Sequence, residues 1–104
     1  MSVRLTALFT ATSDGAVRLR EVLEADARET RDDDGNEIFE LYASTEDGCR
    51  LALVEQWRSQ ADIDAHKTHD HRNQVHAALT GEGILESLEI WRCEPRDTPV
   101  RNSA

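Results

Sequence analysis

The chain has 104 residues, a length that fits a single domain. It carries 21 acidic and 12 basic side chains, so its formal net charge at pH 7 is −9. This balance argues against binding to nucleic acid or to anionic membranes, because both need a basic surface. No apolar run approaches a transmembrane length, and no basic stretch precedes the first apolar residues as in a signal peptide. We therefore expect a cytoplasmic protein.

Apolar and polar side chains alternate from Val3 to Ala11, and this period of two predicts a β-strand. The sequence SDG at residues 13–15 ends the strand and offers a cap to a helix. We predict that helix over residues 16–30, because its apolar side chains recur at helical spacing and its other face is charged. The apolar side chains concerned are Leu19, Val22, Leu23 and Ala27.

The segment RDDDGN, residues 31–36, is typical of a charged turn in which Gly35 supplies a left-handed backbone conformation. Its three consecutive aspartates could bind a cation. We favour a solvated turn, because no second cluster of oxygen ligands follows at the spacing of a calcium loop.

Two further strands are predicted over residues 37–44 and 49–57, and a hairpin loop at 46–48 joins them. Cys49 and Cys93 lie in predicted strands without CxxC spacing, so we interpret them as small buried side chains. A disulfide between them is unneeded in a reducing cytoplasm.

Glu55 stands on the same strand face as three apolar residues, Leu51, Leu53 and Trp57. A carboxylate in that position needs a partner or has a raised pKa. We favour an ion pair with Arg58 or Arg92 over a role as catalytic base, which stays the alternative.

Ser59 and Asp62 have the spacing of a capping box, which predicts that a helix begins there. Asp70 offers the cap of a second helical stretch, and the two glycines in residues 81–83 end it. A last strand is predicted over residues 84–93.

The predicted order is β-α-β-β-α-β. With right-handed crossovers it gives an α+β, ferredoxin-like fold, in which a four-stranded antiparallel sheet carries helices on one face. Residues 1–95 form this domain, and residues 96–104 form a loose C-terminal tail. The last three strands are apolar on both faces, so we predict a homodimer, a dimeric α/β barrel whose sheets face each other around a cavity.

All four histidines fall in one short segment, at His66, His69, His71 and His76. Imidazole can take up and return a proton near neutral pH, although a helix surface can also carry histidines without a function. On a continuous helix Asp70 would share one face with His66 and His69, a donor set that zinc accepts. We predict no metal, because no HExxH motif is present and Asp70 is expected to cap a helix.

Three pieces of the chain together resemble the antibiotic biosynthesis monooxygenase domain, a family that includes quinol monooxygenases. The first two are VRLTALFTATSDGAVRLREVL and TRDDDGNEIFELYAS. The third and most specific is LVEQWRSQADIDAHKTHDH. It resembles the family pattern of a glutamate, a tryptophan, a serine and two histidines, which here are Glu55, Trp57, Ser59, His66 and His71.

The resemblance implies a monooxygenase that uses O2 without a cofactor and oxidises a quinol- or anthrone-like aromatic substrate. We expect His66 and His71 to be the catalytic proton carriers, and the substrate-binding residues to be Trp57, Glu55, Tyr42 and His76. Other proteins of this fold have other functions. An isomerase or other proton-transfer enzyme, and a non-catalytic ligand-binding module of the stress response, are therefore the alternatives.

Overall fold

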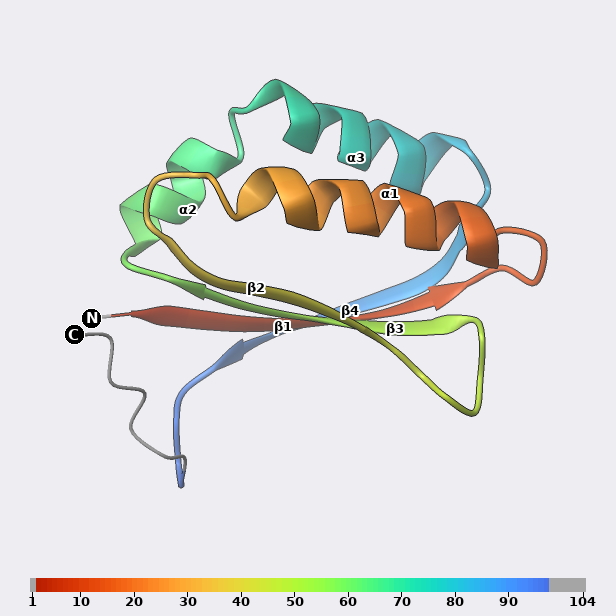
Figure 1. Ribbon diagram of the computed structural model, residues 1–104, viewed down its shortest axis with the longest axis horizontal. Helices are drawn as coiled ribbons and strands as arrows, with labels where there is room; N and C mark the ends of the chain where they lie inside the picture. The colour runs from red at the N-terminus through yellow and green to blue at the C-terminus, as the bar shows by residue number, and fades with distance from the viewer. Residues whose placement is uncertain (1, 98–104) are drawn as a thin grey trace.

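A computed structural model, which describes residues 2–97, contains one four-stranded antiparallel sheet with the strand order β2-β3-β1-β4. Three helices lie together on one side of the sheet (Figure 1). The order along the chain confirms the predicted ferredoxin-like layout, with the second helical region divided in two. The elements are β1 (Val3–Ala11), α1 (Ala16–Thr30), β2 (Asn36–Ala43), β3 (Arg50–Trp57), α2 (Gln60–His66), α3 (Asp70–Gly81) and β4 (Leu85–Cys93).

Strand β1 lies at the centre of the sheet, between β3 and β4. Its residue Ala7 is paired with Leu53 on one side and with Ile90 on the other. Side chains of paired residues point to the same face of a sheet. The side chains of Ala7, Leu53 and Ile90 therefore point towards the helices. Because the side chain of Ala7 is small, it leaves space between the sheet and the helices.

The cap of α1 is a glycine. The sequence predicts the cap within residues 13–15, and the N-cap is Gly15, so no side chain of this segment caps the helix. Close packing explains the glycine, because a Cβ at this position would lie 2.5 Å from the Cα of Ile84.

The starts of α2 and α3 give a mixed result. The Ser59 hydroxyl accepts a hydrogen bond from the backbone N–H of Asp62 at 3.2 Å, which confirms the predicted cap of α2. The predicted cap of α3 at Asp70 is wrong, because His69 is the N-cap and Asp70 is the first helical residue. There the Asp70 carboxylate can still interact favourably with the N-terminal end of the helix dipole.

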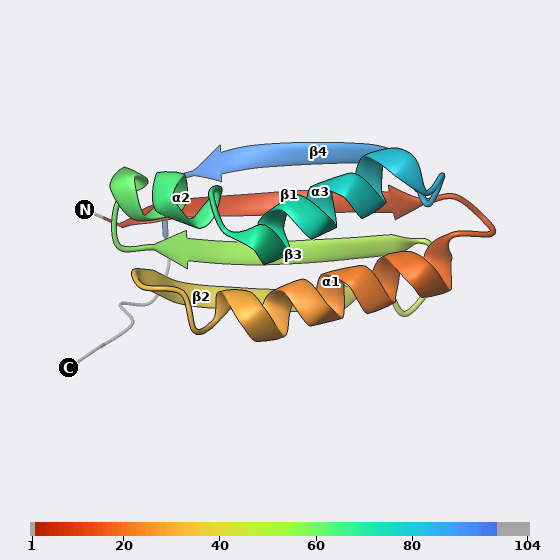
Figure 2. The same cartoon turned by 90° about the horizontal axis from the view of Figure 1, so that it is seen from above.

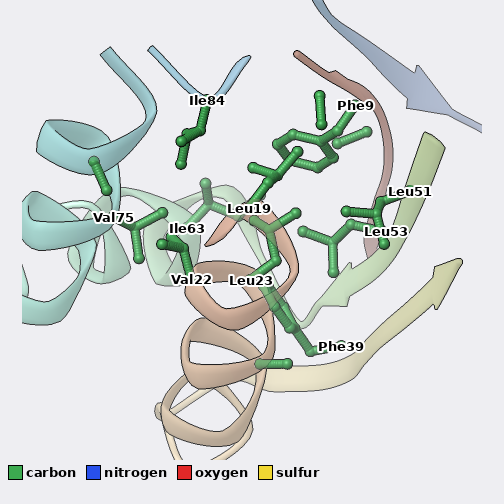
Figure 3. Packing of buried hydrophobic residues seen from close by; sticks show 14 of the residues in the cluster. Phe9, Leu19, Val22, Leu23, Phe39, Leu51, Leu53, Ile63, Val75 and Ile84 are labelled. Atoms are coloured by element: carbon green, nitrogen blue, oxygen red, sulfur yellow. The ribbon is translucent and has the colours of Figure 1, made fainter. Parts of the chain in front are cut away.

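One hydrophobic core fills the layer between the sheet and the helices (Figure 3). Leu19 and Leu23 of α1 pack against apolar side chains of the sheet, among them Phe9, Phe39 and Leu53. Cys49 and Cys93 are free thiols and only half-buried, so the sequence-based interpretation overstated their burial. Within residues 2–97, no helix is long and apolar enough to cross a membrane.

Within residues 2–97, no helix covers the opposite face of the sheet (Figure 1). Large side chains such as Tyr42 and Trp91 are more than half exposed. The homodimer through this face stays a prediction, as does the cytoplasmic location. Most of the predicted tail lies outside the described residues, which end at Asp97.

Candidate active site

A cavity of about 340 Å³ lies between the sheet and the three helices. This volume is within the range of small-molecule sites. Its wall is mostly apolar and includes Leu5, Phe9, Phe39, Ile63, Val75 and Leu79. His66 therefore reaches a cavity that lies under the helices. The cavity predicted between two facing sheets stays a prediction, as does the homodimer.

The cavity reaches the surface beside β4. Leu88 and Ile90 belong to its wall, yet they are 39% and 61% exposed. Figure 2 shows why, since β4 is an edge strand and the helices leave most of its length uncovered. A ligand can enter over this strand.

Seven polar residues among those described also line the cavity, and four of them come from four different elements: Asp26 of α1, Glu55 of β3, His66 of α2 and Arg72 of α3. The other three are Gln60, Lys67 and Arg92. Burial raises the pKa of the Asp26 and Glu55 carboxyls and lowers the pKa of the His66 imidazole. Each change has the sign expected when a charged form loses contact with water.

Glu55 has a different partner from the one predicted. The indole Nε1–H of Trp57 donates to its Oε1 at 3.0 Å, and this bond partly opposes the rise in the Glu55 pKa. The predicted ion pair with Arg58 or Arg92 does not form, because Arg58 pairs with Asp62 and Arg92 donates to the side chain of Gln60. Trp57 is fully buried and lies behind the wall rather than in it.

Asp33 is surrounded by three imidazole rings at one end of the fold. Its Oδ2 lies 2.6 Å from Nδ1 of His66, and its Oδ1 lies 3.1 Å from Nδ1 of His69. Nε2 of His71 is 3.9 Å from Oδ2. The turn after α1 supplies the aspartate, the end of α2 supplies His66, and the start of α3 supplies the other two rings.

The bond to Asp33 sets the proton position on His66. An ionised carboxylate only accepts hydrogen bonds, so Nδ1 of His66 carries the hydrogen and Nε2 keeps its lone pair. Within the described residues, Nε2 has no hydrogen-bond partner, and the ring belongs to the cavity wall. The ring also packs against Trp57, with 4.8 Å between the ring centroids. His66 is thus a buried, oriented base at the edge of an apolar space.

His71 lies one step further from the cavity. Its Nε2 is 3.4 Å from the Thr30 hydroxyl and 3.8 Å from Oδ1 of Asp26, in the groove between α1 and α3. The hydroxyl of Thr30 donates to the same Asp26 oxygen at 3.1 Å. His71 therefore contacts the carboxyl of Asp26, which lines the cavity, but does not line the cavity itself.

Two predicted substrate contacts lie away from this cavity. His76 is exposed on α3 and is not part of the wall. Tyr42 points to the helix-free face of the sheet, where its hydroxyl donates to Glu40 at 3.2 Å.

Sequence reasoning did not single out Asp26, Asp33 or Arg72. Asp26 stands seven residues after Leu19 and three after Leu23, so helical spacing already placed it on the apolar face of α1. Nη1 of Arg72 is buried and has no hydrogen-bond partner among the described residues. A buried donor without a partner next to a cavity is a candidate contact for a ligand.

The comparisons with known proteins agree with this architecture. The family profile described as “Antibiotic biosynthesis monooxygenase” matches residues 2–78. The Mycobacterium tuberculosis protein named “Putative monooxygenase Rv0793” is 37% identical over 95 residues, which cover 91% of this chain and 92% of that protein.

Two solved structures show the same fold. The structure of Rv0793 superposes with a TM-score of 0.82 at 29% identity, covering 96% of this chain and 100% of that one. The structure of PA3566 from Pseudomonas aeruginosa gives a TM-score of 0.85 at 23% identity, covering 92% and 95%. The family match spans β1 to most of α3 and so includes Asp33, most of the cavity wall and the polar wall groups Asp26, Glu55, His66 and Arg72. The chain, on the strength of that match and of the relative at 37% identity, belongs to the antibiotic biosynthesis monooxygenase family.

Proposed function

We propose that this protein is a monooxygenase that oxidises a quinol- or anthrone-like aromatic compound with O2 and without a cofactor. The observation that carries the proposal is the position of His66. Its Nδ1 is anchored by Asp33 at 2.6 Å, while its ring faces an apolar cavity. Arg72, whose buried Nη1 has no hydrogen-bond partner among the described residues, also lines this cavity. A base and a cation at one apolar site suit the formation of an aromatic anion.

The chemistry needs little more than this anion. O2 in its triplet ground state reacts poorly with ordinary closed-shell molecules, but an electron-rich anion can pass it one electron and then recombine with it. For an anthrone-type methylene, the CH2 group and O2 give a C=O group and one water. His66 Nε2 takes the proton, and Arg72 donates to the oxyanion. The apolar wall excludes water, which strengthens both interactions.

The other polar groups have supporting roles in this proposal. Burial raises the pKa of Glu55, and when its carboxyl holds a proton it can donate to a second oxygen of the substrate. Trp57 fixes Glu55 and packs against His66 from behind the wall. His71 lies beyond Asp33 and lines two surface grooves, so it can pass the proton outwards.

Oxygen uptake with a panel of hydroquinones and anthrones tests the proposal. We expect turnover by the wild type and a loss of roughly 10²–10⁴-fold in kcat for His66→Ala, the usual effect of removing a general base. His76→Ala is the matched control, because His76 is exposed and does not line the cavity. The absence of oxygen uptake with every compound, or unchanged turnover in both His66→Ala and His71→Ala, would reject this assignment.

A proton-transfer enzyme, such as an isomerase of a small metabolite, is the second candidate. The cavity favours it because it holds a base, His66, together with two carboxyls of raised pKa that can act as acids. Such an enzyme would exchange a substrate C–H with deuterium from D2O and consume no oxygen. The same substrate panel, followed by NMR in D2O, separates the two candidates.

A further inference from the structure

Asp33 and the three histidines around it form a complete set of metal donors. One ligand atom each from Asp33, His66, His69 and His71 lies within 4.8 Å of all the others. Imidazole nitrogens and a carboxylate oxygen are the donors that zinc takes at 2.0–2.2 Å, so in a tetrahedral site they lie roughly 3.4 Å apart. The carboxylate oxygens of Asp33 already lie 2.6 Å from Nδ1 of His66, 3.1 Å from Nδ1 of His69 and 3.9 Å from Nε2 of His71.

Packing holds three of these donors in place and leaves one side open. The side chains of His66 and Asp33 are 7% and 10% exposed, and that of His71 is 16% exposed. The His69 side chain is 42% exposed. An ion can therefore enter past His69 and meet donors whose conformations the fold already restricts. Pre-organised donors lose little conformational entropy on binding.

The charges behind the donors also favour a cation. Nδ1 of His71, the nitrogen that would not bind the ion, lies 3.7 Å from a carboxylate oxygen of Glu29. A carboxylate behind a ligating histidine orients the ring and raises its basicity, as in many zinc sites. The buried carboxyl of Asp26 lies 3.8 Å from the other nitrogen of His71.

We propose that Asp33, His66, His69 and His71 bind one divalent transition-metal ion of the zinc class. This site goes beyond the oxygenase function and opposes it. An ion bound at Nδ1 of His66 leaves the remaining ring hydrogen on Nε2, the nitrogen that acts as the base. The metal-bound form is therefore a resting form of the enzyme.

Titration with Co²⁺ tests the site directly, using the full chain without an affinity tag after dialysis against a chelator. We expect one equivalent of Co²⁺ to give the strong visible absorption of four-coordinate cobalt, and Zn²⁺ to displace it. His69→Ala removes a half-exposed donor outside the cavity and should weaken Co²⁺ binding by more than ~10-fold. The loss of a residue that only hydrogen-bonds to a metal ligand already weakens binding by about that factor. The matched variant His76→Ala removes an exposed histidine of the same helix and should bind Co²⁺ as the wild type does.

The result that overturns the proposal is equally plain. Either no stoichiometric Co²⁺ spectrum develops, or His69→Ala and Asp33→Asn, shown to be folded by circular dichroism, bind Co²⁺ as tightly as the wild type. An equal loss in His76→Ala would show adventitious surface binding and would also overturn it. None of these measurements uses a substrate. A chain that binds Co²⁺ but never consumes oxygen would thus keep the metal site and reject only the oxygenase.

Discussion

Replacing Trp57 by phenylalanine removes the only hydrogen bond that the described residues give to the buried carboxyl of Glu55. A hydrogen bond to a charged acceptor contributes about 1.5–3 kcal/mol. The change also deletes about three ring atoms from a fully buried side chain, at roughly 0.8 kcal/mol each. We expect Trp57→Phe to lower the free energy of unfolding by about 4–5 kcal/mol, a large part of the ~5–15 kcal/mol of a typical domain.

The background variant Glu55→Gln separates the two contributions. Glutamine keeps an oxygen that can accept the indole N–H, but this acceptor is neutral, and such a bond contributes only about 0.5–1.5 kcal/mol. Trp57→Phe should therefore cost about 1 kcal/mol less in the Glu55→Gln background than in the wild type. The packing loss is the same in both backgrounds and cancels in the difference.

Urea unfolding followed by far-ultraviolet circular dichroism measures all four proteins of this cycle. The difference should grow as the pH rises, because burial raises the pKa of Glu55 and its charged form becomes more populated at higher pH. At low pH Glu55 is protonated, so the glutamate of the wild type and the glutamine of the variant are both neutral and the difference should vanish. An equal cost of Trp57→Phe in both backgrounds at every pH would refute this account of how Glu55 is held.

Three other predictions concern single residues. Glu55→Gln should gain stability relative to the wild type as the pH rises above 4.5, the ordinary pKa of the carboxyl. The folded protein holds the Glu55 proton more tightly than the unfolded chain does, so the stability of the wild type falls above that pH. Free energies of unfolding in urea that follow the same pH dependence in both proteins would contradict this. Gly35→Ala should destabilise the protein, because a side chain at a φ of +84° costs ~1–3 kcal/mol of strain and its Cβ would lie 2.2 Å from Cγ of Asp62. Each kcal/mol lowers the Tm by roughly 4–8 °C. An unchanged Tm in calorimetry would disprove this prediction. Zn²⁺ should slow oxygen consumption by the wild type but not by His69→Ala, when each protein is compared with its own rate in the presence of a chelator. Equal inhibition of both proteins would count against the inference that the bound ion blocks His66.

The order and type of the elements could be predicted from the sequence because local patterns determine them. Alternation identified β1, and the spacing of Leu19, Val22, Leu23 and Ala27 identified the buried face of α1. The left-handed conformation of Gly35 was also predictable from its turn. The helix caps were less predictable, because tertiary contacts decide them. Gly15 is the cap of α1 because the chain around Ile84 leaves no space for a side chain.

The site could be predicted only in part. His66 stood out because it lies in a group of histidines and in a pattern that resembles a family motif. Asp33 did not, because it is one of three consecutive aspartates and local rules do not say which of them turns inwards. Its contact with His66 spans 33 residues and depends on how the turn after α1 meets the end of α2. Asp33 is the residue that makes His66 an oriented base, so the sequence could identify the base but not what orients it.

The polar groups in the cavity wall argue for a ligand rather than for a purely structural role. Folding alone gives no reason to place Glu55 and Arg72 in an apolar layer, and the buried Nη1 of Arg72, which has no partner among the described residues, costs about 1–3 kcal/mol. Apolar residues of similar size would make the domain more stable, as replacements of buried charges often do. A protein that keeps such groups beside an open cavity loses stability for the sake of the site, which is the usual relation between stability and activity in enzymes. A partner that accepts from Arg72 and excludes water would recover part of that cost, and an aromatic oxyanion does both.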